Sequence, residues 1–549
     1  MVPIPVISPR VSAYYQEPFT PAETAILSRF FTNTDRPVFG LINLPEVVKG
    51  ALFARYSRTH KSVRRLFLDE FVDNADLGVE AIAATLPSDD AVVRLNRAEQ
   101  LYDRVFFEFG DDSVAQLGGV HLACEQASNV LTKVLEWGRL AAYLEQSTRY
   151  IAYDRPLGDR YRYFIPEEVR AAGMEQAFTE YMEGIFSFYS EAVTRLVDHF
   201  AAIHPQQTGD SDSLWRSTIR AKAYDTVRGI LPAATQSNVG IYGTGQAYEM
   251  ALVRMQAHPL TEVRAYGGMM LEELRKQIPA FMKRVDLPDR GGAWSEYLAD
   301  ASGAVADLAR GLDEPAEAAG EVTLVDWDKD GELKVAAAAL YSHTEIPDSQ
   351  LLKYVEGLSA DERARILGAY VGDRRNRRHK PGRAMERVSY RFDILSDYGA
   401  FRDLQRHRML TIEWQRLTTR FGYDTPIEVA EVGLLDRWDE IMSRAADLHE
   451  QLRASTNADV AQYVVPFAFR IRYMLEMNAR EAFHLLELRT QPSGHPSYRR
   501  VCQEMHRQIA EVAGHHAIAD AMRFVDHSEP GLARLDEGRR LEEKREQRT

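Results

Sequence analysis

Three adjacent residues in the second half of the chain, Arg406, His407 and Arg408, carry the side chains with the clearest chemical potential. Each arginine offers a fixed guanidinium fork, and a histidine titrates near neutral pH. Such a cluster suits a phosphate group, or an electron-rich ring that gains negative charge when it is reduced. A solvated surface of an arginine-rich chain would look the same, so the triplet becomes informative only through its setting.

The composition is that of a soluble globular protein with more than one core. A length of 549 residues favours two or more domains, and 45% hydrophobic with 27% charged residues gives no sign of disorder. A net charge of −14, from 81 acidic and 67 basic residues, argues against a protein that coats nucleic acid. The two cysteines exclude a disulfide scaffold and fit a reducing cytosol. Neither a secretory signal nor an apolar run of about 18 residues is present, so we expect a cytoplasmic protein without membrane spans.

The elements that must position the triplet are mostly helical. Apolar periodicity predicts helices over about 75–150, 160–205 and 214–285, and again from the triplet to about 525, after a helix that begins near Pro45. A β-rich run and an Asp/Gly turn open the second half. Glycine- and alanine-rich sequence between about 290 and 320 marks a composition shift. We therefore predict domains at residues 1–295 and 321–549, joined by a linker at 296–320.

Four features recur in the same order in both halves, as a diverged tandem duplication predicts. Residues 54–59 resemble residues 339–344, and residues 227–232 resemble residues 461–466. Arg139 precedes Arg149 by ten residues, as Arg408 precedes Arg420 by twelve. Arg254 is followed by His258, as Arg489 is followed by His495. No single echo is decisive, but chance rarely preserves such an order.

These ordered elements resemble the flavin-dependent thymidylate synthases, which carry an Arg-His-Arg-x7-Ser signature, and the resemblance covers most of both halves. It implies a helix-rich α/β fold of two tandem thymidylate-synthase-complementing-type domains that form a pseudo-dimer. A homodimer of such chains would supply the four domains of the family's tetramer. The resemblance also implies FAD as cofactor, with NADPH and methylenetetrahydrofolate as co-substrates in the methylation of dUMP to dTMP.

The second half resembles the flavin side of a family site. The resemblance assigns cofactor contacts to His379 and Glu386 of HKPGRAMER, to Arg406, His407 and Arg408, to Asn478 and Arg480 of an Asn-Ala-Arg element, and to Ser57 and Ser342, for which helix packing is the alternative. Two positions depart from the family's pattern. Arg416 replaces the signature serine, with the register regained at Arg420 through a two-residue insertion, and Gln462 replaces a phosphate-binding arginine.

The first half resembles the nucleotide side. Trp137-Gly138-Arg139 replaces the triplet, yet the motif that follows keeps the family's spacing. The resemblance assigns substrate contacts to Glu145, Ser147, Arg149, Arg228, Arg254, Arg420 and Arg489. Ser147 and Arg149 would cradle a 5′-phosphate that Arg228 closes. A helix cap for Ser147 and a surface ion pair for Arg149 are the alternatives.

The implied chemistry raises the electron density of a uracil ring without a protein nucleophile. Cys124 and Cys502 lie in segments that we expect to be helical, where buried inert thiols are the simpler interpretation. A flavin would instead supply a hydride. Arg408 would stabilise the reduced flavin, while Arg254 and Arg489 polarise the uracil, so these three arginines are the expected catalytic residues. The spacing of the histidines matches no metal-ligand pattern, and no metal is expected.

The sequence thus predicts a cytoplasmic FAD-dependent thymidylate synthase-like enzyme that acts on a dUMP-like nucleotide, without nucleic-acid or membrane partners. Flavin contacts from one half and phosphate contacts from the other would form a composite site. Two alternatives stay open. One is flavin-dependent modification of a different pyrimidine nucleotide, and the other is a non-catalytic nucleotide or flavin binder.

Overall fold

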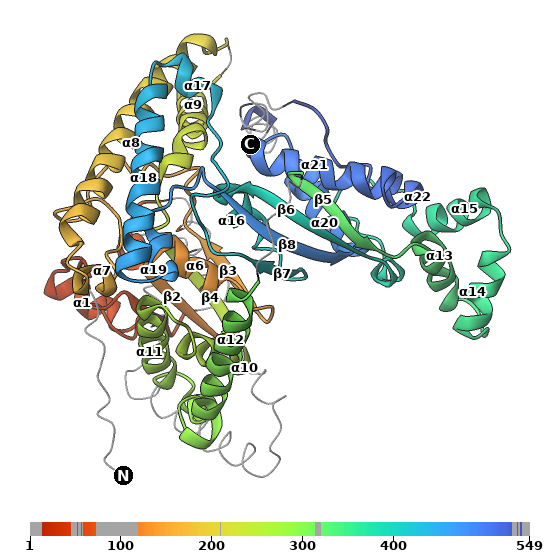
Figure 1. The fold of residues 1–549 in the computed structure, drawn as a ribbon, viewed down its shortest axis with the longest axis horizontal. Helices are drawn as coiled ribbons and strands as arrows, with labels where there is room; N and C mark the ends of the chain where they lie inside the picture. The colour runs from red at the N-terminus through yellow and green to blue at the C-terminus, as the bar shows by residue number, and fades with distance from the viewer. Residues whose placement is uncertain are drawn as a thin grey trace. The chain divides into compact units, whose positions relative to one another are not determined.

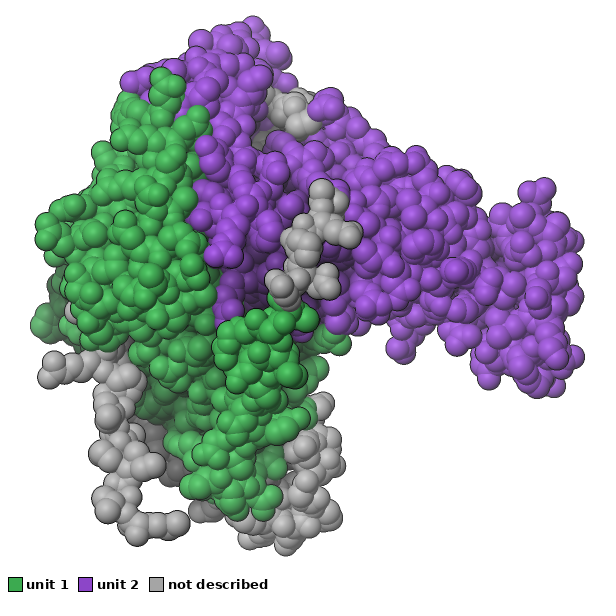
Figure 2. Space-filling view, in the orientation of Figure 1, with its two compact units in different colours: residues 1–193, 230–315, 436–465 green, residues 194–229, 316–435, 466–549 purple. Residues whose placement is uncertain are grey.

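The chain in the computed structural model (Figure 1) divides into two compact units (Figure 2). Unit 1 comprises residues 1–193, 230–315 and 436–465, and unit 2 comprises residues 194–229, 316–435 and 466–549. The structure describes residues 14–44, 52, 56, 59–72, 119–208, 210–312, 320–529, 535 and 538–540. Each unit therefore combines most of one half of the sequence with a helical segment from the other half.

Unit 1 contains a four-stranded antiparallel sheet in the order β1-β2-β4-β3. Its strands are β1 (Val38–Leu41), β2 (Gly119–Ser128), β3 (Ala141–Glu145) and β4 (Gln236–Thr244). The helical segments are α1 (Pro21–Leu27), α3 (Val63–Leu66), η1 (Phe67–Val72), α6 (Asn129–Leu135), α7 (Glu167–Ala171), most of α8 (Glu175–Ile203), α10 (Gly245–Gln256), α11 (Thr261–Arg275), η5 (Pro279–Met282), η6 (Pro288–Gly292), α12 (Ala293–Arg310), α18 (Leu435–Ser455), α19 (Ala458–Ala461) and η8 (Gln462–Val464). Helix α11 packs against β1 and β2, and the rings of Phe30, Phe31, Phe39 and Phe67 form a buried cluster beside them.

Unit 2 contains a second four-stranded antiparallel sheet, in the order β5-β6-β8-β7. Its strands are β5 (Val322–Trp327), β6 (Ser389–Asp397), β7 (Thr411–Trp414) and β8 (Arg470–Asn478). The helical segments are α9 (Asp212–Val227), η4 (Arg228–Ile230), α13 (Gly331–Tyr341), α14 (Asp348–Glu356), α15 (Ala360–Val371), η7 (Arg383–Arg387), α16 (Tyr398–Leu404), α17 (Ile427–Glu431), α20 (Ala479–Arg489), α21 (Pro496–Glu511) and α22 (His516–Ala521). Helix α21 packs against β5 and β6 (Figure 1).

The two sheets repeat one another. In each sheet, the strands that come second and fourth along the chain lie at the centre: β2 and β4 in unit 1, and β6 and β8 in unit 2. The fourth strand runs directly into a helix. Strand β4 leads into α10 with Thr244 as the N-cap, and β8 leads into α20 with Asn478 as the N-cap. The predicted fold class, a helix-rich α/β protein with two tandem related domains, is confirmed.

Side-chain alternation explains the central strands of unit 2. On β8, Ile471, Tyr473, Leu475 and Met477 are buried, while the residues between them are half-buried. A period of two places one apolar face on the core. Strand β8 pairs with β6 along the whole length of both, from Asn478 opposite Ser389 to Arg470 opposite Asp397.

Strands β2, β3, β4, β7 and β8 stand where the sequence periodicity predicted other structure. Residues 119–128, 141–145, 411–414 and 470–478 were predicted to be helical, and the glycine-rich residues 236–244 were predicted to interrupt a helical block. Strands β2, β4 and β8 are paired on both sides and β3 and β7 on one side, and pairing outweighs local helix propensity. Cys124 therefore lies in a strand rather than a helix, whereas Cys502 is helical as predicted. Burial raises the pKa of both thiols, that of Cys502 to about 12, so neither is ionised at neutral pH.

The connection between the predicted domains is largely helical. Helix α12 covers residues 293–310 and overlaps the segment 296–320 for which we predicted a linker, and one of the boundaries between the units falls at 315/316. The predicted domain limits stay a prediction. The helix expected from Pro45 to about residue 71 lies partly outside the described residues; within them, residues 63–72 are helical as α3 and η1, whereas residues 59–62 are not. Among the helices that the structure describes, none has the length and apolar character needed to cross a membrane.

Candidate functional site

The triplet lies in unit 2, in the turn between α16 and β7. Asp397 starts α16, because its Oδ1 accepts a hydrogen bond from the backbone N–H of Ala400 at 2.9 Å. The three side chains that follow this short helix differ in solvent exposure: Arg406 is half-buried, His407 is buried and Arg408 is exposed. The triplet therefore presents one solvent-facing cation rather than three equivalent groups.

His407 connects the triplet to helix α20. Its Nδ1 lies 3.2 Å from Glu481 Oε1, and its Nε2 accepts a hydrogen bond from Arg489 Nε at 2.9 Å. Because an arginine N–H can only donate, Nε2 carries no proton and the Nδ1–H donates to Glu481. Burial lowers the pKa of His407 to about 4, so the imidazole is neutral at pH 7. The sequence-based expectation of a group that titrates near neutrality is wrong for this buried ring.

Glu481 is the anionic centre of this network. Burial would raise its pKa, but the hydrogen bonds from His407 and His484 outweigh that effect and lower the pKa to about 2. The distance from His484 Nδ1 to Glu481 Oε2 is 3.3 Å, and the two imidazole rings lie 5.1 Å apart in an edge-on arrangement. We call His407, Glu481, His484 and Arg489 the α20 network.

The Asn-Ala-Arg element begins the same helix. Asn478 Oδ1 accepts a hydrogen bond from the Glu481 backbone N–H at 2.9 Å, which makes it the N-cap of α20. Arg480 Nη1 lies 2.9 Å from Glu386 Oε1, and Arg480 Nε donates to the carbonyl of Pro381 at 3.1 Å. The segment HKPGRAMER is therefore attached directly to α20. His379, at its start, is exposed.

A buried ion pair holds the basic loop that precedes this segment. Arg374 Nη1 lies 2.7 Å from Glu487 Oε1 and Nη2 lies 2.5 Å from Oε2, with both side chains almost fully buried. The same guanidinium donates to the carbonyl of His379. This bidentate pair fixes the loop on α20, while Arg375 and Arg378 remain exposed.

Two other residues predicted for unit 2 lie outside the α20 network. Ser342 is exposed at the C-terminal end of α13, a helix that contacts η7, the segment containing Glu386. Arg420 is exposed in the turn after β7. Ser57 lies outside the described residues. The structure thus brings together the triplet, Asn478, Arg480, Glu386 and Arg489.

The ligand atoms of His407, Glu481 and His484 all lie within 4.8 Å of one another, a grouping that could hold a metal ion. The hydrogen bond from Arg489 argues for another interpretation. It requires the proton of His407 to sit on Nδ1, the nitrogen that would have to bind the metal. We therefore interpret the grouping as a hydrogen-bonded network.

The nucleotide motif of the first half lies in unit 1. Ser147 is half-buried, and its Oγ accepts a hydrogen bond from the Arg149 backbone N–H at 3.2 Å. Arg149 is only 9% exposed, so a simple surface ion pair does not describe it. Glu145, at the end of β3, is buried with its Oε2 3.7 Å from Lys133 Nζ.

Arg254 of α10 also belongs to unit 1. Its guanidinium lies over the ring of Trp137, 5.2 Å from the ring centroid, and burial lowers its pKa. Trp137 is the residue that replaces the first arginine of the triplet in this half. The tryptophan thus offers a ring face, and no charge, at that position.

Arg228 belongs to unit 2, whereas Ser147 and Arg149 belong to unit 1. It is 3% exposed, and its Nη1 lies 3.0 Å from Asp403 Oδ2. Its partner in the described structure is therefore a carboxylate, and the phosphate role expected from the sequence stays a prediction. Gln462, which stands where the second half has lost the matching arginine, lies in unit 1.

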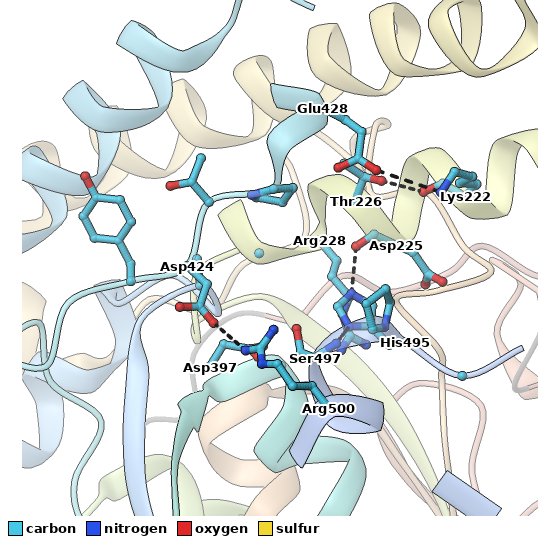
Figure 3. Close-up of a pocket in the computed structure, with 18 of the residues that line it drawn as sticks. Lys222, Asp225, Thr226, Arg228, Asp397, Asp424, Glu428, His495, Ser497 and Arg500 are labelled. Carbon is cyan, nitrogen blue, oxygen red and sulfur yellow. Dashed lines mark hydrogen bonds and ion pairs between the residues drawn. The ribbon is translucent and has the colours of Figure 1, made fainter. Parts of the chain in front are cut away.

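A cavity of about 800 Å³ in unit 2 was not predicted (Figure 3). The segments around it are α9, η4, the start of α16, residues 423–428 and the N-terminus of α21. Arg228 is the one predicted site residue in its wall; Asp397, Asp424, His495 and Arg500 were not predicted as site residues. These residues come from four separate segments, and no spacing motif connects them.

The residues of the α20 network and its surroundings suit an anionic flavin nucleotide. Arg408 is exposed, and the side chain of Arg480 is 41% exposed. The exposed Arg375 and Arg378 lie on the loop that Arg374 anchors to the same helix. Guanidinium groups are the usual partners of phosphate oxygens, so this part of unit 2 has the donors that a flavin pyrophosphate requires.

Comparisons with known proteins agree with the repeat. The model of the family described as thymidylate synthase complementing protein matches residues 68–280 and again residues 323–514. A UPF0159 protein of Chlamydia muridarum is 38% identical over 521 residues, which cover 94% of this chain and 97% of that protein. A flavin-dependent thymidylate synthase of Clostridium tetani is 25% identical over 210 residues, 38% of this chain and 75% of its own length. Among solved structures, a UMP/dUMP methylase from Streptomyces cacaoi bound with 5-Br dUMP covers 37% of this chain and 96% of its own, with 18% identity and a TM-score of 0.29.

Proposed function

The chain belongs to the thymidylate synthase complementing protein family, and from that premise we propose that it is an FAD-dependent thymidylate synthase-like enzyme. Its substrate would be dUMP, methylated to dTMP with methylenetetrahydrofolate and NADPH as co-substrates. A nucleotide-modifying reaction agrees with the name of the Clostridium tetani relative.

One observation carries this proposal: Arg489 Nε donates a hydrogen bond to His407 Nε2 at 2.9 Å. The resemblance places the triplet beside the flavin and Arg489 beside the nucleotide. The bond attaches Arg489 to the central residue of the triplet, next in sequence to Arg408, so the segments expected to bind the two ligands are joined. Hydride transfer between a flavin and a pyrimidine ring requires that proximity.

Within this proposal, each residue of the α20 network has a definite task. Glu481 holds the Nδ1–H of His407, which leaves Nε2 as an acceptor that orients the Arg489 guanidinium. His407 is a positioning residue, because it acts through Arg489. Arg408 and Arg480 would hold the flavin nucleotide, and the flavin, when bound, would supply the hydride.

The nucleotide phosphate is assigned to unit 1. Ser147 and the largely buried Arg149 offer a hydroxyl and a guanidinium two residues apart in one turn. A buried arginine binds a phosphate more strongly than an exposed one, because water competes less for the charge. Arg254 would contact the nucleotide from α10.

The test is an absorbance spectrum of the purified full-length protein, followed by titration with dUMP while the flavin bands are recorded. We expect FAD to be bound and its bands to shift on addition of dUMP. Arg489→Ala should keep the flavin and weaken dUMP binding by about tenfold or more, which corresponds to about 1.4 kcal/mol. Arg507→Ala is the matched control, because this exposed arginine of α21 pairs with Glu504 at 2.8 Å, outside the α20 network and the basic loop. Failure to take up FAD on reconstitution would contradict the proposal.

A second candidate function is flavin-dependent modification of another pyrimidine nucleotide. The observation that favours it is the exposed Arg416 at the position of the signature serine. A long cation in place of a small hydroxyl changes the shape and charge presented to a substrate. Flavin bands that respond to a different pyrimidine nucleotide, but not to dUMP, would support this candidate.

A further inference from the structure

Helix α12 of unit 1 is buried at one point only (Figure 1). Of its 18 residues, Ser295 alone is buried, and its Oγ lies 3.0 Å from the carbonyl oxygen of Val253 and 2.9 Å from that of Gly291. These contacts attach the first turn of α12 to α10 and η6. The rest of the helix leaves its side chains exposed or half-buried.

The exposed length of α12 carries an apolar stripe. Its members follow one another in alternating steps of four and three residues: Trp294, Leu298, Ala301, Val305, Leu308 and, just after the helix ends, Leu312. This heptad spacing places them in one narrow line along an α-helix. Val305 is 66% exposed and Leu308 is 78% exposed. We call these six residues the α12 stripe, and a continuous exposed apolar face of this kind marks a contact with another molecule.

The charged residues of the helix lie away from the stripe. They share the opposite face, about 120° or more from the centre of the stripe: Glu296, Asp300, Asp307 and Arg310. The residues that flank the stripe are uncharged and mostly small: Tyr297, Ser302, Ala304 and Ala309. Charges at flanking positions usually select the partner of such a helix, and α12 has none there.

This distribution of charge disfavours a membrane and a basic partner. A helix that lies on a lipid surface carries lysine and arginine on its polar face, whereas α12 has three carboxylates and one arginine there. A basic protein would require carboxylates beside the stripe. Two copies of a chain with a net charge of −14 repel each other unless their contact excludes carboxylates, and the stripe with its flanks meets that condition.

The stripe is also complementary to itself in the antiparallel orientation. Centred on Gly303, two copies of α12 would form layers that each combine different positions: Trp294 with Leu312, Leu298 with Leu308, and Ala301 with Val305. A parallel pair would instead place alanine on alanine and tryptophan on tryptophan, in layers of very unequal width. A two-fold contact of the antiparallel kind uses the same surface on both copies.

We propose that the α12 stripe is an interface between two copies of this chain, in which α12 of one copy packs antiparallel against α12 of the other. The small flanking residues let the two helices approach closely. The sequence predicted a homodimer through the family resemblance alone, whereas this interface follows from the exposed residues of α12 and does not require the proposed function.

The dissociation constant of self-association, measured by sedimentation of the full-length protein, tests the interface. Val305→Glu places a carboxylate within the stripe of each copy and should weaken association at least about tenfold, because the dimer would bury both charges. Gly303→Glu is the matched control. It introduces the same residue on the opposite face, where a Cβ atom would meet nothing within 4 Å, and it should associate like the wild type. The melting temperature of each variant verifies that it is folded.

A short bifunctional thiol reagent tests the orientation. In the antiparallel pair, residue 302 of each copy lies beside the two-fold axis, so Ser302→Cys should give a cross-linked dimer. Gly303→Cys, on the far face, should stay unlinked. Leu308→Cys should also stay unlinked, because its two copies would lie about 15 Å apart along the helix axis. The native Cys124 and Cys502 are buried, which limits the background reaction.

A wild type that stays monomeric would overturn the proposal, and so would a Val305→Glu variant that associates like the wild type. A lower melting temperature of Val305→Glu without weaker association would also overturn it, because the stripe would then be covered by its own chain. Cross-linking through Leu308→Cys in place of Ser302→Cys would contradict the antiparallel arrangement and with it the proposed interface.

Discussion

At the scale of single residues, burial gives neighbouring side chains of similar chemistry different properties. Arg406, His407 and Arg408 are adjacent in sequence, yet only Arg408 is exposed. The imidazole between the two arginines is surrounded by a donor from Arg489 on one side and the Glu481 carboxylate on the other. Its charge state follows from these partners, and none of them is near it in sequence.

The neutral state of His407 predicts a specific NMR signature. In the full-length protein, the nitrogen shifts of this ring should remain those of the Nδ1–H tautomer from pH 8 down to about pH 5. Protonation is expected near the lowered pKa of about 4. In Arg489→Ala, Nε2 loses its donor and the coulombic repulsion that opposes protonation, so the pKa of His407 should rise. A ring that titrates between pH 6 and 7 in the wild type would contradict the network.

Glu262 predicts a pH dependence of stability in unit 1. It is buried and accepts hydrogen bonds from Ser128 N at 2.9 Å, Ser128 Oγ at 2.6 Å and Tyr463 Oη at 2.7 Å. Burial nevertheless raises its pKa from 4.5 to about 7. The folded state therefore binds the proton more tightly than the unfolded chain, so this stabilisation is complete below pH 4.5 and is lost as the pH rises through about 7.

The measurement is the free energy of unfolding of wild type and Glu262→Gln at pH 5 and pH 8. The wild type should lose up to about 3 kcal/mol more than the variant over this range, from a pKa difference of about 2.5. The comparison uses the difference between the two pH values, so the cost of the substitution itself cancels. Identical losses in the two proteins would assign the pH dependence to other groups.

At the scale of elements, the repeat provides an internal control for the Asn-Ala-Arg helix. Asn478 caps α20 and Thr244 caps α10, with cap hydrogen bonds of 2.9 Å to Glu481 N and 3.3 Å to Ala247 N. Removing either side-chain acceptor leaves a helix N–H without its partner and should cost about 1 kcal/mol of stability. The two substitutions are thus matched in their structural effect.

Asn478→Ala and Thr244→Ala should therefore lower the melting temperature by similar amounts. Only Asn478→Ala should also weaken FAD binding, because α20 carries Arg480 and the network around His407. Thermal denaturation and a flavin titration of both variants supply the comparison. Equal flavin affinity in the two variants would mean that Asn478 is a helix cap and nothing more.

Local sequence patterns predicted some of the helices and strands of unit 2 but not others. Helices α20 and α21 lie in the segment from the triplet to about residue 525 that apolar periodicity predicted to be helical. Strand β8 was not, although RIRYMLEMN alternates with a period of two. Its arginine, methionine, leucine and glutamate residues are good helix formers, and only pairing with β6 and β7 over the sheet makes the strand the better state.

At the scale of the whole molecule, the same limit applies to the site. The resemblance predicted that the triplet, Asn478, Arg480 and Glu386 belong together, and contacts through α20 join them. It also grouped Arg228 with Ser147 and Arg149, and that grouping stays a prediction, since Arg228 belongs to unit 2, where it contacts Asp403, and the other two belong to unit 1. Segments exchanged between sequence halves cannot be recognised from local motifs, because the order along the chain does not determine which core a helix joins.

The asymmetry of the two halves predicts the number of flavins. The complete triplet and the Asn-Ala-Arg element occur in unit 2, whereas unit 1 has Trp137 and Gly138 at the triplet positions and Thr244 as the helix cap. We therefore expect one FAD per chain. Protein and released flavin are quantified after heat denaturation, and a ratio of two flavins per chain would mean that the first half has kept a flavin site despite its substitutions.

The same asymmetry predicts that the two ligands respond to different substitutions. Arg408 is exposed in unit 2, and Arg149 is largely buried in unit 1. Each can therefore be substituted without changing the other unit. Arg408→Ala should weaken FAD binding by about tenfold with little effect on stability, because an exposed charge contributes little to folding.

Arg149→Ala should leave FAD binding intact and weaken dUMP binding by about tenfold or more. Both affinities are measured by titration on each variant. An Arg149→Ala protein that binds dUMP normally would remove the nucleotide phosphate from unit 1, and the phosphate would then have to be sought among the arginines of unit 2.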